Sequence, residues 1–277
     1  MTDQSHDSTP VEKLAIKHNL KVSYYPIFDH SLITKNTLGL CASFDHLLPT
    51  EIIQLFAGKL YNLHPSLLPQ YRNVSPVQYA IALGDHETGI TLFCISAGID
   101  NGQIVAQVSE PILPTDTTPT LTSRLFEKGS QLYLNFLHTN KSTGTLENRN
   151  TRKPIFTHRL TRDSGHLEWP ILQKLLANQL ISPTNTKNEL LSLRLGSDLK
   201  ECAKPAESSA GRSDPHGTLI LHDLIRALTP WPGVWTTAPT KKGDLHLSIE
   251  SVLPKLTVKL AGKPKPISYS DFNKYYL

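Results

Sequence analysis

The sequence predicts an α/β layered domain followed by a small β unit. Between residues 38 and 137, short apolar segments typical of buried strands alternate with amphipathic helical segments, which is the pattern of a sheet covered by helices. After residue 229 the apolar residues alternate over short stretches instead, which favours a separate β unit. The 277 residues, 39% of them hydrophobic, suffice for one sizeable core and a smaller unit.

The strands expected in the first part rest on short apolar runs. Residues 38–44 (LGLCASF) and 59–62 are predicted strands, and residues 51–56 between them fit one or two helical turns. Residues 88–95 and 103–109 are predicted strands joined by a turn that contains glycines.

Two hydroxyl residues followed by proline mark predicted helix starts. Ser75 is the expected N-cap of a helix over residues 76–83 that ends at Gly84. Thr118 repeats the signal before a helix that reaches about residue 137. One face of this second helix is apolar and carries Leu121, Leu125 and Leu132.

The later part of the chain is predicted to combine loops, helices and strands. Residues 141–153 are an expected loop, and residues 200–216 are an expected flexible linker or insertion because they are polar. The predicted helices and strands of this part cover residues 169–180, 218–228, 245–252 and 256–260. We therefore divide the chain into units over residues 1–140, 141–228 and 229–277.

Composition restricts the cellular context. The net charge of +4 permits an acidic partner. The three cysteines are far apart and show neither a disulfide framework nor zinc-ligand spacing, which indicates a reducing compartment. No apolar run approaches the about 18 residues of a membrane span, and the polar first residues do not resemble a secretory signal. We expect a cytoplasmic protein, or one of an organellar matrix in a eukaryote, without a membrane partner.

A candidate site lies between residues 61 and 107. Asn62 and His64 stand two positions apart at the end of a predicted strand, so their side chains face the same way. Ligands of open α/β sheets bind at the carboxyl ends of strands. Asp100 lies in a turn next to glycines, where a polar group can be aimed into a cleft. An amide, an imidazole and a carboxylate without a nucleophilic Ser or Cys indicate direct group transfer, with oxyanion stabilisation and proton movement.

Ordinary structural roles also explain these three residues. Asn62 can cap a strand end, and His64 can be a surface histidine. Asp100 can be a simple turn residue, because Asp-Asn-Gly is strong turn chemistry. Spacing alone does not decide between these roles and a catalytic one.

The wider segment resembles the signature of the folate-dependent formyltransferase family. The matching positions are Asn62, His64, Ser66 to Pro69, Arg72, Gly84-Asp85, Thr88-Gly89-Ile90-Thr91 and Asp100-Asn101-Gly102. The resemblance implies a Rossmann-like formyltransferase core with Asn62, His64 and Asp100 as catalytic residues. It implies N10-formyltetrahydrofolate as the formyl donor, with no metal and no covalent enzyme intermediate. The implied folate contacts are Ser66, Leu67, Leu68 and Pro69, with Leu47, Leu48 and Pro49 lining the pterin pocket.

The same resemblance implies a mechanism. A substrate amine attacks the formyl carbon, and Asn62 and a protonated His64 bind the developing oxyanion. Asp100 orients His64 and helps to remove the proton of the amine. Since a neighbouring carboxylate raises the pKa of an imidazole, we expect a raised pKa for His64.

Three later segments resemble the methionyl-tRNA formyltransferase branch of the family: residues 225–235 (IRALTPWPGVW), 166–169 (HLEW) and 262–272 (GKPKPISYSDF). This branch implies a monomer that formylates initiator methionyl-tRNA in support of translation initiation. Basic residues suit a phosphate backbone, and the implied tRNA contacts are Arg72, Lys241, Lys242, Lys263 and Lys265. A lysine-rich solvated surface explains the lysines equally well. The open alternatives are a formyltransferase for an amino-sugar nucleotide or other small amine, and a catalytically degenerate folate- or RNA-binding remnant.

The sequence departs from the family pattern at several points. Residues 10–14 (PVEKL) resemble a helix that normally lies well inside the family's chain, so we expect an N-terminally incomplete core with an exposed apolar sheet edge. Asn73 stands where the family has Gly, a change that Asn tolerates because it adopts positive φ more readily than most residues. Asp45 stands where Gly is common. The short end of the chain predicts a reduced OB-like β-barrel.

Overall fold

The computed structural model of the chain describes residues 9–24, 30–44, 46–139, 154–179, 181–196, 217–253 and 255–277. The predicted loop over residues 141–153, the predicted flexible segment over residues 200–216 and the Asp45 position lie outside them. Within the described residues, no helix is both long enough and apolar enough to cross a membrane.

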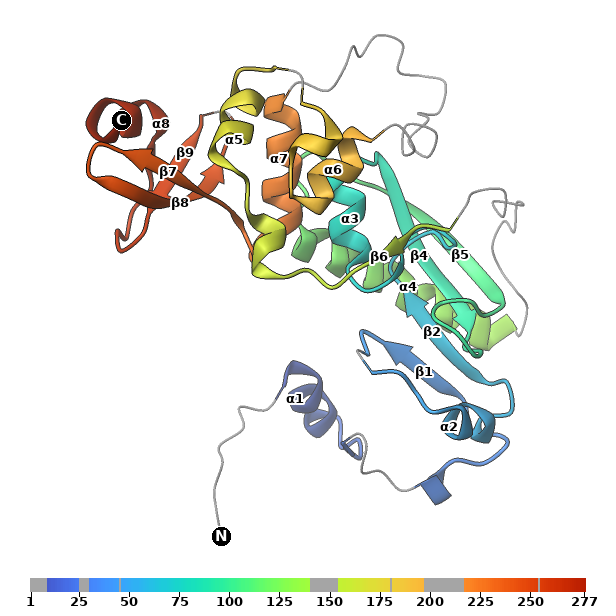
Figure 1. The fold of residues 1–277 in the computed structure, drawn as a ribbon. Coiled ribbons are helices and arrows are strands. Elements are labelled where there is room, and N and C mark those ends of the chain that lie inside the picture. The colour runs from blue at the N-terminus through green and yellow to red at the C-terminus, as the bar shows by residue number, and fades with distance from the viewer. Residues whose placement is uncertain are drawn as a thin grey trace.

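The first part of the molecule is built on a four-stranded mixed sheet of order β1-β2-β4-β5 (Figure 1). β1 (Gly39–Ala42) is parallel to β2 (Leu60–His64). β4 (Glu87–Cys94) is antiparallel to β2 and to β5 (Ile104–Pro111). The four predicted strands are confirmed, and β2 extends to His64 rather than ending at Asn62.

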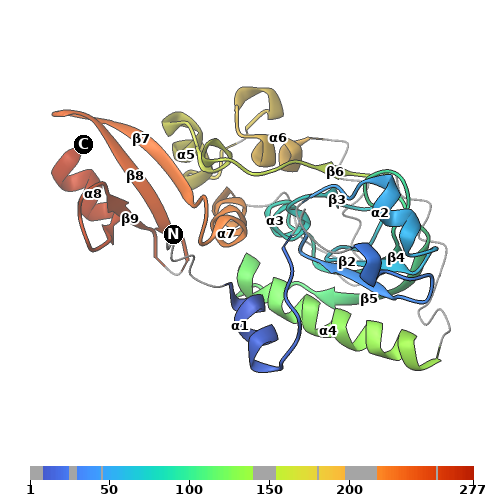
Figure 2. The same cartoon turned by 90° about the horizontal axis from the view of Figure 1, so that it is seen from below.

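The helix α4 (Thr118–Thr139) covers one face of this sheet (Figure 2). Tyr61 of β2 packs on Phe136 of α4 with ring centroids 5.0 Å apart. Because side chains alternate along a strand, Asn62 and His64 point to the opposite face of the sheet. The predicted helix is confirmed, but Thr118 is its first residue and not its cap, and the Thr118 hydroxyl donates to the Ala227 carbonyl.

The helix α3 (Pro76–Ala82) is almost entirely buried and packs against α7 (Gly217–Leu228). Ser75 occupies the N-cap position of α3, as predicted, but it has a φ of 65° and its side chain makes no capping hydrogen bond. The short helix α2 (Thr50–Leu55) follows β1.

The helices of the middle region pack against α7 and α3. α5 (Trp169–Leu176) lies close to its predicted position. α6 (Glu189–Leu195) was not predicted, and it begins where the Asn188 side chain accepts a hydrogen bond from the Leu191 amide. Single helical turns occur at η1 (His30–Leu32), η3 (Arg162–Gly165) and η4 (Pro183–Asn185).

The C-terminal part is a four-stranded antiparallel sheet of order β10-β9-β8-β7. The strands are β7 (Val234–Thr240), β8 (Gly243–Ser251), β9 (Thr257–Leu260) and β10 (Ile267–Ser268), and helix α8 (Tyr269–Tyr276) follows. β8 and β9 were predicted, whereas β7, β10 and α8 were not. The edge strands β7 and β10 do not pair with each other in the described part of the chain. The sheet is therefore open where a reduced OB-like barrel was predicted.

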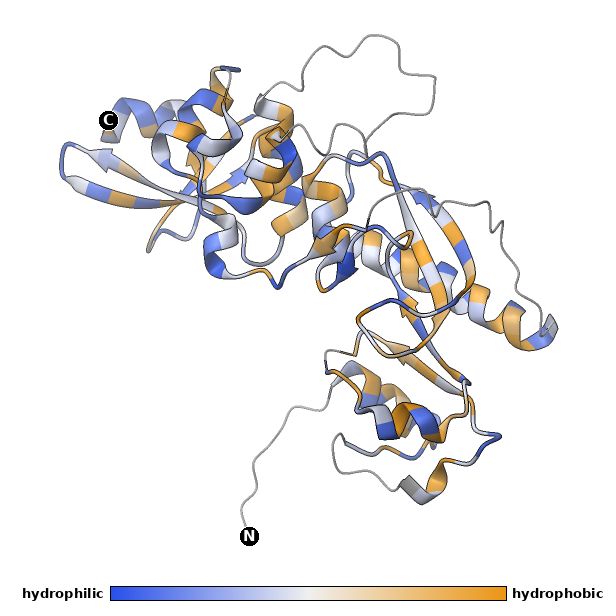
Figure 3. Ribbon diagram, turned by 45° about the vertical axis from the view of Figure 1, so that its right-hand side comes forward, coloured by the Kyte–Doolittle hydropathy of each residue, from blue (hydrophilic) through white to orange (hydrophobic). Residues whose placement is uncertain are grey.

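The N-terminal elements lie at the margin of the fold, and Figure 3 shows hydrophobic stretches along them. The helix α1 (Pro10–Lys17) buries none of its residues, although the Thr9 hydroxyl caps it by accepting from the Glu12 amide. β1 is an edge strand of its sheet. Exposed apolar side chains follow this edge, at Leu38 (48%), Leu40 (40%) and Phe44 (41%). The expectation of an exposed apolar sheet edge is confirmed.

Candidate functional site

The candidate site is built on the end of β2, on the face that α4 leaves open. Asn62 is half-buried, and its side-chain amide makes no hydrogen bond with any residue that the structure describes. His64 is buried, with 5% of its surface exposed. The amide of Asn62 is therefore available to a ligand, whereas His64 is held by the protein.

The His64 ring lies between two oxygen atoms. Its Nε2 is 2.8 Å from the Tyr71 carbonyl oxygen, and its Nδ1 is 3.5 Å from Asp100 Oδ2. A carbonyl oxygen only accepts hydrogen bonds, so Nε2 carries the ring proton. Asp100 Oδ2 is fixed in turn because it accepts from the Asn73 amide at 2.7 Å. The structure therefore brings His64 and Asp100 together, with Asn62 one step back along the same strand face.

Left-handed backbone conformations shape the loops around His64. The φ angles are 56° at Tyr71, 82° at Asn73 and 46° at Asp100. Such angles are uncommon outside glycine, and Asn and Asp adopt them more readily than most residues. Asn73 therefore reproduces the conformation that a glycine would provide, as its sequence position predicts.

Further contacts to the loops around His64 come from a segment that is distant in the sequence. β3 (Arg72–Asn73) pairs in parallel with β6 (Phe156–Thr157). The Thr157 hydroxyl contacts the Arg72 carbonyl at 2.7 Å and the Val74 carbonyl, and the Thr157 carbonyl accepts from Asn73 Nδ2 at 3.0 Å. The sequence alone does not identify Tyr71 and Thr157 as parts of the site. Tyr71 acts through its backbone and Thr157 is far away in the chain, so neither leaves a local signal.

The pKa of His64 is lowered from its ordinary value. Burial of the ring is the largest cause and disfavours the charged form, and the neighbouring Arg72 acts in the same direction. The Asp100 carboxylate and the Tyr71 carbonyl oppose this effect without outweighing it. The expectation of a raised pKa was wrong because it counted the carboxylate but could not include the loss of solvent around the ring.

The loop predicted to contact folate is mostly buried. The side chains of Ser66, Leu68 and Pro69 are buried, and the Ser66 hydroxyl donates to the Gln70 carbonyl at 2.6 Å. Leu67 is half-buried against Gly89, where an added Cβ would lie 2.5 Å from Leu67 Cδ2. This loop can therefore present Leu67 and backbone groups to a ligand, while its remaining side chains fix its shape.

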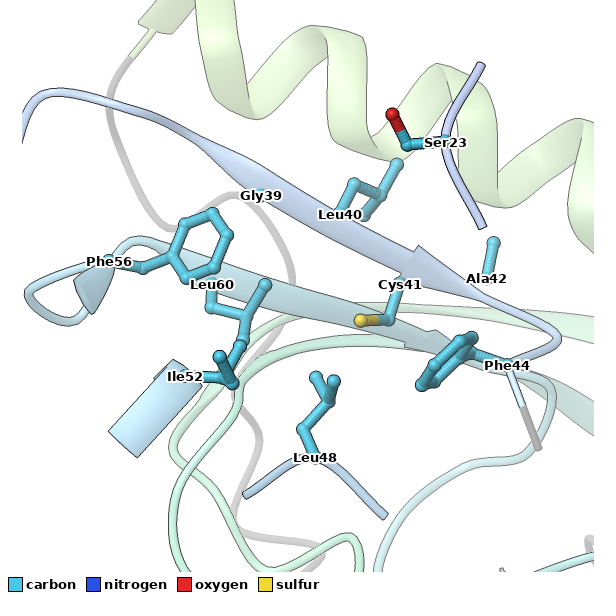
Figure 4. A pocket seen from close by; sticks show the side chains of 10 residues that line it. All are labelled: Ser23, Gly39, Leu40, Cys41, Ala42, Phe44, Leu48, Ile52, Phe56 and Leu60. Carbon is cyan, nitrogen blue, oxygen red and sulfur yellow. The ribbon is translucent and has the colours of Figure 1, made fainter. Parts of the chain in front are cut away.

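An apolar hollow of about 440 Å³ adjoins the site (Figure 4). Its lining includes Cys41, Leu48 and Leu60. Cys41 is the register partner of Asn62 on the neighbouring strand, so the part of the hollow that Cys41 lines is on the same sheet face as the Asn62 amide. Of the three residues expected to line the pterin pocket, Leu48 lines this hollow, whereas Leu47 is 78% exposed and Pro49 also faces solvent. An apolar hollow next to a free amide suits a flat organic ring with polar edges.

The predicted tRNA contacts are spread over the molecule. Arg72 is half-buried near His64 and lies over the Phe156 ring, with its Cζ 5.9 Å from the centroid. The four lysines are exposed on two turns of the C-terminal sheet: Lys241, Lys242, Lys263 and Lys265. The described residues contain no group of three or more His, Cys, Asp or Glu side chains that could hold a metal ion.

Comparison with known proteins assigns the chain to a family. The formyl transferase family model matches residues 10–137. A methionyl-tRNA formyltransferase from Roseiflexus castenholzii is 30% identical over 277 residues, which covers 96% of this chain and 81% of the relative. The chain belongs to the methionyl-tRNA formyltransferase family.

Alignments with other members of the family cover a smaller part of those proteins. The methionyl-tRNA formyltransferase of Buchnera aphidicola subsp. Schizaphis graminum is 34% identical over 168 residues, which covers 58% of this chain and 54% of the relative. The chain spans about half the length of several curated relatives, with coverages of 54%, 58% and 52%.

A solved structure supports the α/β formyltransferase fold. The N-formyltransferase from Helicobacter canadensis, in complex with folinic acid and dTDP-3-aminofucose, aligns with a TM-score of 0.52 and 19% identity. The alignment covers 96% of this chain and 84% of that one. At this identity the likeness concerns the fold, which is the Rossmann-like α/β architecture expected from the sequence.

Proposed function

We propose that the chain transfers the formyl group of N10-formyltetrahydrofolate to the amino group of methionyl-tRNA, and so supports translation initiation. The observation that carries this proposal is the buried His64 ring between the Tyr71 carbonyl and the Asp100 carboxylate, with the uncommitted Asn62 amide on the same face. Membership of the methionyl-tRNA formyltransferase family supports the choice of acceptor. The folate donor is supported by the family model and by the adjoining apolar hollow.

The proposed catalytic roles follow from the geometry. The Asn62 amide donates to the oxyanion that develops on the formyl oxygen, in a site where burial strengthens the interaction. His64 is neutral at pH 7, because its pKa is lowered, and accepts the proton of the attacking amine at Nδ1. The resulting imidazolium is then flanked by Asp100 and by the Tyr71 carbonyl, which stabilise it. As the new carbon–nitrogen bond forms and the old one breaks, a proton passes to the departing N10 nitrogen.

The remaining assignments are part of the same proposal. The hollow beside Asn62 holds the pterin, with Leu48 on its wall and the loop over residues 66–69 at its side. The open sheet within residues 229–277 serves as the tRNA-binding unit, in which the lysines of its turns meet the tRNA backbone, with Arg72 nearer the reacting end. The catalytic unit comprises residues 1–140 and the linker region residues 141–228. The chain acts as a monomer in the cytoplasm or an organellar matrix.

The test is formyl transfer from labelled N10-formyltetrahydrofolate to three acceptors: methionyl-tRNA, an amino-sugar nucleotide and a simple primary amine. We expect methionyl-tRNA to be formylated, and His64→Ala to lower the rate at least about 100-fold, as for loss of an acid–base group. His86→Ala is the matched control because His86 is exposed and its backbone carbonyl accepts from Ile112.

Two outcomes would overturn the proposal. Formylation of the sugar nucleotide or the amine, without formylation of methionyl-tRNA, would favour a small-amine formyltransferase. Folate binding without any transfer, unchanged by His64→Ala, would indicate a binding protein that has lost catalysis.

A further inference from the structure

The outer face of the C-terminal sheet carries a column of aromatic rings far from His64 in the sequence. Trp235 of β7 lies between two histidine rings, with centroid distances of 4.3 Å to His166 and 4.9 Å to His246. Both ring pairs are inclined by 35°. His166 precedes α5 and joins β7 through an isolated parallel bridge to Trp235. Three segments of the chain therefore contribute to this ring column, which we define as His166, Trp235 and His246.

The ring column lies on the open side of the sheet. Neighbouring residues Thr236 and Leu247 are fully buried, and the helices α5, α7 and α8 pack against the sheet. Since side chains alternate along strands, Trp235 and His246 face away from this core, and all three rings are half-exposed. Figure 1 shows β7 and β8 beside α8 at the C-terminal end of the molecule.

Basic side chains share this face with the ring column. The Arg162 guanidinium lies over the Trp235 ring with its Cζ 5.5 Å from the centroid, and the Trp235 indole N–H donates to the Arg162 carbonyl at 3.0 Å. Lys259 of β9 pairs with Ser248, which in turn pairs with Trp235, so the three share one row of the outer face. The pKa of His246 is lowered by burial first, and then by its electrostatic interactions with Arg162 and His166.

The acidic groups on this face lie toward its ends. Alternation along β8 places Asp244 and Glu250 on the same side as His246, and both are exposed. Asp244 pairs with Pro239 near the β7–β8 turn, and Glu250 lies at the register shift near the other end of β8. The centre of the face therefore combines stacked rings with Arg162 and Lys259.

We propose that the ring column is a binding platform for an unpaired RNA nucleotide, whose base stacks on the column while Arg162 and Lys259 contact the flanking phosphates. Unpaired bases are recognised in RNA by stacking on aromatic rings, histidine included, and on arginine guanidinium planes. A sheet face with basic residues beside such rings offers a stacking surface for the base and positive charge for the phosphates. The proposal rests on the proposed function in that the acceptor is an RNA, and it adds a contact distinct from the four lysines of the turns.

The test compares two single-stranded probes: a six-nucleotide oligoadenylate and an abasic six-unit ribose–phosphate strand of the same charge. We expect the wild-type chain to bind the oligoadenylate more tightly by about 5- to 150-fold, as for one to three kcal/mol of base stacking. His246→Ala is expected to remove most of this preference and to leave the affinity for the abasic strand unchanged. Trp235→Phe, which keeps a ring in place, is expected to retain the preference. His138→Ala, an exposed histidine of α4, is the matched control.

The charged groups are tested through salt dependence. Arg162→Gln and Lys259→Gln are each expected to weaken binding of both strands and to reduce the salt slope by about 0.7, the value for one phosphate contact on a single strand. Lys17→Gln, at the end of α1, is the matched control.

The proposed platform would be refuted if the wild type bound the two strands equally, or if His246→Ala kept the full preference for oligoadenylate over the abasic strand. The same holds if no strand binds. These failures are distinguishable from failure of the proposed function, because formylation of methionyl-tRNA is measured separately. A chain that formylates this tRNA without preferring oligoadenylate would retain its function and lack the platform.

Discussion

Replacement of Asp100 by Asn is expected to lower formyl transfer by about 100-fold while leaving the fold intact. The Asn side chain has the same shape, and its carbonyl oxygen can still accept from the Asn73 amide that now bonds Asp100. What it lacks is the negative charge beside His64. According to the proposed mechanism, this charge stabilises the imidazolium that forms when His64 takes the proton of the amine.

The distance between the two groups sets the size of the effect. At the observed 3.5 Å, a unit charge pair in an effective dielectric of about 20 interacts by about 4.7 kcal/mol. Each 1.36 kcal/mol of barrier is a factor of ten in rate, so about 3,000-fold is the upper limit. The Asp100 side chain is 14% exposed, and solvent screens part of the interaction, which brings the expected loss to about 100-fold.

The assay is the pH profile of kcat/KM for formylation of methionyl-tRNA. His64 acts in its neutral form, so activity falls as the pH drops through its pKa. Removing Asp100 removes a cause that raises this pKa, so the acid limb of Asp100→Asn moves to lower pH while the plateau falls. An acid limb that stays in place or moves to higher pH, or a loss below about threefold, would refute the reasoning. Glu127→Gln, an exposed carboxylate on α4, controls for the change of charge.

Three further predictions concern stability. The Asp223 carboxylate lies 2.8 and 2.9 Å from the guanidinium groups of Arg194 and Arg226. Asp223→Ala removes this buried counter-charge, so we expect the free energy of unfolding measured in urea to fall by about 3–5 kcal/mol. Gly102→Ala places a Cβ 1.7 Å from a β4 carbonyl oxygen and is expected to cost more than about 4 kcal/mol or prevent folding. Because the pKa of His64 is lowered in the folded state, the unfolded chain binds the proton first, and the free energy of unfolding should fall as the pH decreases below about 6.5. His64→Gln should reduce this slope by at most about 1.4 kcal/mol per pH unit.

Each stability prediction has a control in the same chain. Asp163→Ala removes a carboxylate that is exposed and is expected to change stability by less than about 0.5 kcal/mol. Gly58→Ala adds a Cβ with no atom within 4 Å, so its cost is limited to the positive φ at about 1–2 kcal/mol. A pH dependence in His64→Gln identical to that of the wild type would contradict the assignment of the buried neutral histidine.

The local pattern of apolar residues in the sequence was sufficient to predict much of the fold. The strands of the first sheet and the helix α4 follow from apolar periodicity, which depends on neighbours along the chain. α6 escaped prediction because its buried pair, Leu190 and Leu191, lies in a stretch that is polar on average. β7 escaped because Pro239 and the preceding proline-rich turn mask the alternation of its inward residues. These elements are stabilised mainly by tertiary packing, which leaves little signal in the local sequence.

The sequence by itself determined that Asn62 and His64 share one strand face, that Asn73 suits a left-handed conformation, and that the chain carries a formyltransferase signature. Only the tertiary structure decided what surrounds His64. Asp100 reaches the ring because it also accepts from an amide 27 residues away, and Thr157 supports the loop from 85 residues away. The direction of the pKa shift depends on burial by all of these segments together. Side-chain direction and backbone preference are local properties of the chain, whereas solvent exclusion and electrostatic environment arise only when distant segments meet.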